Sequence, residues 1–226
     1  MPSRLLAVTF EAEDPAEPAR FWAALLGREI LEDTGGLLLP GTDTQLGLRF
    51  APGRAGPVGA NRMHLHLTSD DQQRKVATAV KLGGRHLDVG QRPEEPHVVL
   101  ADPAGYEFCV IEPGNGYLAG CGPLGELTCA GSRQAGLFWS EALGWPLVWD
   151  RGEQTAIQSP RGGTKVAWDA WDSTADRQRF ELLPDGDQQA AIDALTSLGA
   201  AQLDARDDGT AVLADPDGTE FCVRPG

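Results

Sequence analysis

Basic residues are scarce in this sequence. Its 226 residues include 19 lysines and arginines against 33 aspartates and glutamates, which gives a formal net charge of −14. A surface this acidic repels nucleic-acid phosphates and anionic membranes, so we expect neither as a partner and favour neutral or cationic molecules. Long apolar runs are also missing, because stretches such as Leu37-Leu38-Leu39 fall far short of the ~20 residues of a membrane-spanning helix.

The sequence also lacks a recognisable secretion signal and a cysteine motif. The first residues, MPSRLLAVTFEAED, reach charged positions too early for the apolar core of a signal peptide. The four cysteines show no C-x-x-C spacing, which argues against a structural zinc site. We therefore expect a cytoplasmic protein with reduced thiols, with a Cys121–Cys129 disulfide as the alternative.

The sequence does contain an internal repeat. Three segments recur in the same order, offset by 113 to 117 positions: LADPAGYEFCV (100–110) and LADPDGTEFCV (213–223), FWAALLG (21–27) and FWSEALG (138–144), DQQRKVATAVKLGG (71–84) and DQQAAIDALTSLGA (187–200). Such a repeat predicts two copies of one domain. We place them at 1–113 and 122–226, joined by a Gly-rich linker at 114–121.

Each copy has the same order of predicted elements. In the first, residues 7–12 alternate as a half-buried strand, and the Asp14-Pro15 start, the Phe21-Trp22 stripe and Gly27 predict a helix. Three short strand candidates follow, and the pattern restarts at 63–68 with a helix expected to be capped at Ser69. Each domain is thus predicted to be an α+β fold made of two βαβββ units.

Paired βαβββ units with a D-P-x-x-x-x-x-F-W…L-G helix and a closing D-P-x-G-x-x-F-C strand resemble the vicinal oxygen chelate superfamily. This superfamily includes glyoxalase I, extradiol dioxygenases and bleomycin-resistance proteins. The resemblance covers nearly the whole chain. It implies that the eight strands of each domain form a cup-shaped mixed sheet with helices outside, and that ligand, cofactor or metal binds in the cup.

The resemblance also implies where a metal would bind, because metal-dependent members hold it with His, Gln or Glu from the first, fourth, fifth and eighth strands. Counting from the helix starts puts these positions at Ala7, near Gly47, His64 and Cys109 in the first copy, and at Leu124, near Lys165 or Val166, Phe180 and Cys222 in the second. Only His64 matches by residue type, apart from the cysteines. We therefore predict no metal and no other cofactor.

His64 and His66 are the best remaining argument for a metal. Side chains two apart on a strand point the same way, about 7 Å from each other, so both imidazoles would enter one cup. With Glu11 or Cys109 they would form a mixed site that zinc, iron or nickel tolerates. The alternative is a pair of hydrogen-bonding histidines in a polar pocket, with His64 and Glu11 as the candidates for metal-free acid–base catalysis.

The predicted ligand-binding residues are those expected to line the two cups. Glu11 and Glu126 lie on the first strands in phase with Thr9 and Thr128, and five of six tryptophans lie in the second copy, including Trp149 and Trp168. Aromatic walls in an acidic protein suit planar or cationic ligands. The full set is Thr9, Glu11, His64, His66, Cys109, Glu126, Thr128, Trp149, Trp168, Phe180 and Cys222.

Three functions remain open. The first is a protein that binds a small organic molecule without a metal, and sequesters or transforms it. The second is a metal-dependent lyase or dioxygenase with its site in the first copy, and the third is an interaction or regulatory module whose cups are filled by side chains. Because fused copies can complete each other's cups, we expect either a monomer or a homodimer.

Overall fold

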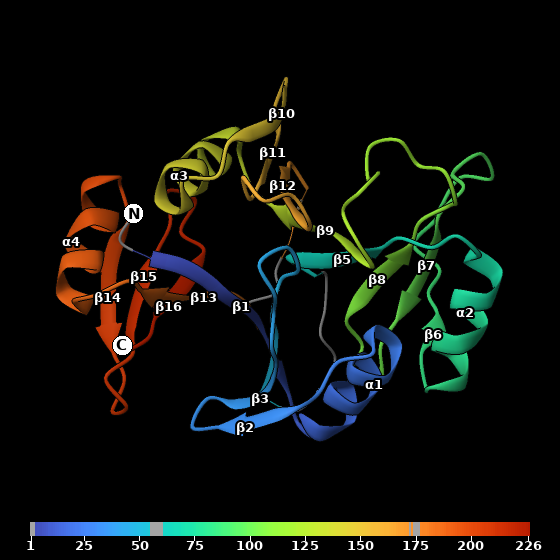
Figure 1. Ribbon diagram of the computed structural model, residues 1–226, viewed down its shortest axis with the longest axis horizontal. Coiled ribbons are helices and arrows are strands. Elements are labelled where there is room, and N and C mark those ends of the chain that lie inside the picture. The colour runs from blue at the N-terminus through green and yellow to red at the C-terminus, as the bar shows by residue number, and fades with distance from the viewer. Residues whose placement is uncertain (1–2, 55–60, 172, 174–176) are drawn as a thin grey trace.

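The computed structural model describes residues 3–54, 61–171, 173 and 177–226 (Figure 1). These residues form four successive βαβββ units. The first repeat contains β1 (Ser3–Ala12), α1 (Ala16–Leu26), β2 (Leu31–Asp33), β3 (Gly36–Leu39), β4 (Leu48–Pro52), and then β5 (Met63–Leu67), α2 (Gln72–Lys81), β6 (Arg85–His86), β7 (Val98–Ala101) and β8 (Glu107–Val110). The second contains β9 (Leu124–Ala130), α3 (Arg133–Leu143), β10 (Leu147–Arg151), β11 (Gln154–Gln158), β12 (Lys165–Asp169), and then β13 (Gln178–Pro184), α4 (Gln188–Ser197), β14 (Ala201–Ala205), β15 (Ala211–Ala214) and β16 (Glu220–Val223).

The strands form two eight-stranded sheets, and each sheet takes one unit from each repeat. Sheet A has the order β14-β15-β16-β13-β1-β4-β3-β2, and sheet B has the order β10-β11-β12-β9-β5-β8-β7-β6. In Figure 1 the blue strands of the first unit therefore lie beside the red strands of the last. The predicted fold class is confirmed, but the expectation that the eight strands of one repeat form one cup is wrong.

The reason lies in the pairing of the strands that begin the units. Strand β1 pairs antiparallel with β13 from Ser3 opposite Pro184 to Phe10 opposite Gln178. Strand β5 pairs antiparallel with β9 from Met63 opposite Cys129 to Leu67 opposite Leu124. These pairs satisfy the inner edges of all four units. Exchange of equivalent elements between copies of one domain costs little, because the contacts exchanged are alike.

The helices pack on the face of each sheet that is turned away from the cup. The apolar stripes of α1 and α3 bury Phe21, Trp22, Phe138 and Trp139 in a hydrophobic core to which both sheets contribute. Helix α3 lies so close to β11 that a Cβ at Gly136 would collide with Thr155. Helix α2 is capped by Asp71, which accepts a hydrogen bond from the backbone N–H of Arg74 at 2.9 Å, rather than by Ser69 as predicted.

The repeated D-P-x-G turn fixes the helix tryptophans. The indole N–H of Trp22 donates to Asp102 at 2.8 Å, and that of Trp139 donates to Asp215 at 3.1 Å. Asp102 also accepts from the backbone N–H of Tyr106 at 2.9 Å. Burial raises the pKa of Asp102 to about 6 against the opposing effect of these donors. The turn aspartate is therefore a buried acceptor that ties the first unit of each repeat to the second.

Two expectations about the whole chain can be compared with the structure. The four cysteines are free and buried, so Cys121 and Cys129 do not form a disulfide. Within the described residues, no helix has the length and apolarity that crossing a membrane requires.

Replacing Asp102 by alanine should lower the free energy of unfolding by about 1–3 kcal/mol, because the buried Trp22 indole and Tyr106 amide lose their acceptor. The matched control is Asp88→Ala, in an exposed turn where Asp88 accepts only from Gly90; it should cost about 0.5 kcal/mol or less. Urea unfolding measures both variants. Equal losses would contradict the assigned role of Asp102.

Candidate functional site

Strand alternation divides each sheet into a core face and a cup face. On β5, Met63, Leu65 and Leu67 belong to the core, which leaves His64 and His66 on the other face. We call the face of sheet A that is turned away from the core cup A, and the corresponding face of sheet B cup B. Because each sheet combines two repeats, cup A contains Thr9, Glu11 and Cys222, while cup B contains His64, His66, Cys109, Glu126 and Thr128.

Cup A is filled by ion pairs at its centre. The guanidinium of Arg49, only 1% exposed, donates from Nε to Glu181 at 2.7 Å and makes two further bonds to Asp33 at 2.5 and 3.0 Å. Arg224 lies 3.8 Å from the other oxygen of Glu181. A Cβ at Gly35 would collide with Arg224 and Arg49, so this glycine allows the network to close. Buried arginine paired in this way stays charged and rigid.

The predicted site residues of cup A are paired or buried, although Glu11 also borders a separate pocket of about 340 Å³ beside Glu13 and Asp14. Glu11 pairs with Arg179 at 2.5 Å, and Thr9, opposite Arg179 in the strand register, is completely buried. Burial raises the pKa of the Cys222 thiol. Phe180 lies on the core face, with its ring 4.6 Å from Trp139, because the strand phase of β13 puts Arg179 and Glu181 in the cup instead.

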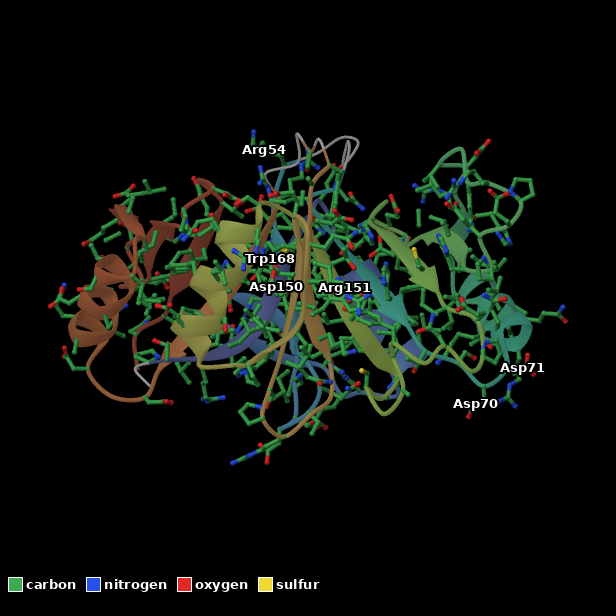
Figure 2. The ribbon with its side chains drawn as sticks, turned by 90° about the horizontal axis from the view of Figure 1, so that it is seen from above. Arg54, Asp70, Asp71, Asp150, Arg151 and Trp168 are labelled. Carbon is green, nitrogen blue, oxygen red and sulfur yellow. The ribbon has the colours of Figure 1, made fainter. Side chains whose placement is uncertain are left out.

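Cup B contains a cavity of about 340 Å³. Its lining comes from β5, β9, β10, β11, β12 and the linker, and consists of His66, Tyr117, Glu126, Thr128, Trp149, Gln154, Thr155, Ala167, Trp168 and Asp169. In Figure 2, Asp150 and Arg151 of β10 and Trp168 of β12 mark this end of sheet B. The cavity exists where two small side chains, Ala167 and Thr128, lie opposite each other in neighbouring strands.

The carboxylate of Glu126 is the hub of this cup. It accepts from the Tyr117 hydroxyl at 2.7 Å, from His66 Nδ1 at 2.8 Å and from the Thr128 hydroxyl at 3.2 Å. Burial alone raises the pKa of Glu126, but the hydrogen bonds from His66, Tyr117 and Thr128 outweigh it and the pKa is lowered. Glu126 is therefore an anion that only accepts hydrogen bonds.

The two histidines of β5 differ in charge at neutral pH: His66 is protonated and His64 is neutral. Burial lowers the pKa of His66, but Cys109 and Glu126 outweigh it and raise the pKa to about 10. Burial and the neighbouring His66 lower the pKa of His64 to about 3. His64 is therefore a neutral ring, 5.1 Å from the ring of His66 and 5.3 Å from that of Trp171.

The linker closes one side of cup B through Tyr117. The ammonium of Lys165 lies 3.8 Å from the centre of the Tyr117 ring and donates to the Tyr117 carbonyl at 2.5 Å. The other aromatic wall, Trp149, meets Tyr117 edge to face at 5.7 Å, and the guanidinium of Arg151 covers the Trp149 ring at 4.3 Å. Cys109 is buried beneath the linker, in a small apolar cluster with Leu118.

The structure brings together only part of the predicted set. His66, Glu126, Thr128 and Trp149 meet at one cavity, whereas Trp168 contributes from the core side, where its ring lies 6.5 Å from Phe180. The two residues proposed as catalytic, Glu11 and His64, are on different sheets. A metal set of His64 and His66 with Glu11 is therefore wrong, because Glu126 occupies the place in the cup that Glu11 was expected to take.

Comparison with known proteins agrees with this architecture. A family model described as a glyoxalase-like domain matches twice, at residues 7–111 and 126–224. The chain belongs to the glyoxalase-like domain family. No relative is found among the curated proteins.

Among solved structures, glyoxalase I from Zea mays is similar over 98% of this chain and 92% of that protein, with 16% sequence identity and a TM-score of 0.66. A Bacillus subtilis protein proposed to be a dioxygenase is similar over 98% of this chain and 84% of its own, with 15% identity and a TM-score of 0.63. Identities this low show the shared fold.

The row of cup-facing side chains across the central strands of sheet B does not suit a metal ion. The register row across the central strands of sheet B reads Cys109, His66, Glu126, Lys165. Lys165 has no lone pair to donate while it is charged, and Nδ1 of His66 is bonded to Glu126. Within the described part of the chain, no three His, Cys, Asp or Glu side chains are arranged to hold a metal ion. The donor set does not fit the group.

Tyr117, Arg49 and Glu181 were missed by the sequence analysis, and Lys165 was only noted as a family metal position. One signal was present: Arg49 and Lys165 occupy matching positions of the two repeats, 116 residues apart, so a cation recurs at one strand position. Tyr117 gave no signal, because it lies in a Gly-rich linker with no periodicity.

The charged His66–Glu126 pair predicts a specific pH dependence. A histidine whose pKa is raised from 6.5 to about 10 on folding contributes stability that is complete below pH 6.5 and is lost as pH rises through 10. The wild type should therefore have a higher free energy of unfolding than His66→Gln. This difference should be largest below pH 6.5 and should shrink steadily toward pH 10. A difference that is constant or grows with pH would show that His66 is not protonated in the folded state.

Proposed function

We propose that cup B binds a small planar organic molecule without a metal ion, and that this binding is the function of the protein. The observation that carries the proposal is the cavity of about 340 Å³ between two aromatic walls, Trp149 and Tyr117, above a polar floor. This volume lies in the range of small-molecule sites, which combine apolar walls with a few fixed polar groups.

The contrast with cup A supports the choice of cup B. At the centre of cup A, the Arg49 guanidinium binds Asp33 and Glu181, so its donors are already used. In cup B the matching Lys165 is turned to Tyr117, and the space above Ala167 stays open. Side chains thus fill one cup in the way an interaction module would predict, while the other keeps the form of a binding site.

The charge states of the floor favour binding over acid–base catalysis. A general acid or base works best when its pKa lies near the working pH. The pKa of His66 is raised to about 10 and that of Glu126 is lowered, so at neutral pH the pair holds its proton firmly. The hydrogen bonds between these groups give a preorganised polar floor that a ligand meets without rearrangement. Sequestration of a metabolite or drug is the activity that this arrangement supports.

The proposal is tested with benzamide, a small planar amide, by ligand-observed NMR in buffer with excess EDTA. Binding with a dissociation constant of about 1 mM or lower is expected. Ala167→Leu should abolish binding, because its larger side chain projects into the space between the aromatic walls where the ligand ring would lie. The matched control is Ala51→Leu, at the same repeat position in cup A, which should keep the affinity of the wild type. Melting curves verify that both variants are folded.

Two outcomes would contradict the proposal. Binding that is seen in buffer without EDTA but is absent in excess EDTA would show that a metal ion is required. Binding that survives in a folded Ala167→Leu variant, or is lost in Ala51→Leu alone, would place the ligand elsewhere.

A further inference from the structure

The hydrogen bonds around Glu126 determine which way the cavity's hydroxyl groups face. An ionised carboxylate can only accept, so the hydrogens of the Tyr117 and Thr128 hydroxyls must both point to Glu126. Each hydroxyl oxygen then has only lone pairs left for any other partner. A wall with two hydroxyl groups therefore acts toward a ligand as a wall of acceptors.

A second carboxylate has the same effect at the other end of β12. The side-chain amide of Gln154 donates one of its two N–H groups to Asp169 at 2.7 Å, which leaves the amide oxygen and one N–H for other partners. Asp169 is half-buried, borders the cavity, and makes no ion pair with any side chain in the described residues. Its other oxygen accepts from the backbone N–H of Ala170 at 2.8 Å, so Asp169 has hydrogen-bond donors but no cation to balance its charge among these residues.

Two cations near the cavity, His66 and Lys165, are already engaged by acceptors of the protein, and a third, Arg151, lies over the Trp149 ring. Nδ1 of His66 donates to Glu126, and the side chain of Cys109 is a second hydrogen-bonding partner of the imidazole. The Lys165 ammonium lies on the Tyr117 ring and donates to the Tyr117 carbonyl. Both cations thus neutralise acceptors of the protein. An anionic ligand would have to compete with Glu126 for them, and would meet Asp169 as a like charge.

We propose that the molecule bound in cup B carries a planar, positively charged N–H donor group, of the amidine, guanidine or protonated aminoheterocycle class. The inference rests on the proposed function and specifies its ligand. The N–H groups would donate to Asp169 and to the acceptor oxygens of Tyr117 and Thr128, while the ring lies against Trp149.

The protein contains an example of this recognition. The guanidinium of Arg151 lies over the Trp149 ring, 4.3 Å from its centre. Planar cations stack on indole because the ring face is negative, and the attraction increases as water is excluded. A ligand of the same chemistry would meet the same indole inside the cavity, with Asp169 in place of solvent.

Three compounds of one shape separate this inference from the proposed function: benzamidine, which is cationic and only donates, benzamide, which is neutral, and benzoate, which is anionic and only accepts. Dissociation constants for all three are measured by ligand-observed NMR at pH 7. Benzamidine is expected to bind at least about tenfold more tightly than benzoate, equivalent to about 1.4 kcal/mol, with benzamide between them.

Asp169→Asn keeps the shape of the side chain and removes its charge. It should weaken the binding of benzamidine by about fivefold and change the dissociation constant of benzamide by less than about twofold. The matched control is Asp150→Asn on β10, whose exposed carboxylate is paired with Arg133 at 2.7 Å outside the cavity lining. This variant should leave all three dissociation constants unchanged.

Benzoate binding as tightly as benzamidine, or equal effects of Asp169→Asn and Asp150→Asn on benzamidine, would overturn the inference while benzamide binding still supports the site. If none of the three compounds binds the folded wild type, the proposed function fails, and the inference fails with it.

Discussion

The antiparallel pairing of β1 with β13 and of β5 with β9 is the constraint on which the rest of this structure depends. It joins one unit of each repeat into each sheet, so neither repeat forms a cup by itself. It also determines the chemistry of the cups, because His66 of the first repeat lies opposite Glu126 of the second. The polar floor of cup B is therefore a property of the fused chain and cannot be assigned to either copy.

Duplication has given the two cups the same framework and different interiors. A basic side chain occupies equivalent positions on β4 and β12, but Arg49 is long and forked, and it ties Glu181 and Asp33 into a buried network. Lys165 is a point charge that Tyr117 of the linker covers. Arginine at this position thus links the side chains at the centre of cup A, whereas lysine at the matching position leaves room for the cavity in cup B. In both, a cation lies among the central strands of the cup.

The sequence predicts the repeat, the order of elements and the cup-facing phase of His64 and His66, because these follow from local periodicity and from the duplication. It does not predict which units pair, since β13 and β9 offer equally suitable edges to β1 and β5. The connection between strand and helix is also one residue shorter in the last unit: cup-facing Glu181 lies six residues before the helix cap Asp187, whereas His64 lies seven before Asp71. Counting from helix starts therefore put Phe180 in a cup and missed Glu181. Glu11 was assigned to the same cup as His64 because the sequence does not show that β1 and β5 belong to different sheets.

Cup B is expected to bind a ligand, whereas the ion pairs of Arg49 with Glu181 and Asp33 occupy the centre of cup A. The most direct measurement is a two-dimensional ¹H–¹⁵N NMR titration of the ¹⁵N-labelled full chain with benzamidine. We expect the largest shift changes on the cavity lining, at Thr128, Trp149 and Ala167. The signals of Glu11 and Ala51 in cup A, which match Thr128 and Ala167, should stay unchanged. Shift changes concentrated on β1, β4 and β13 would contradict it.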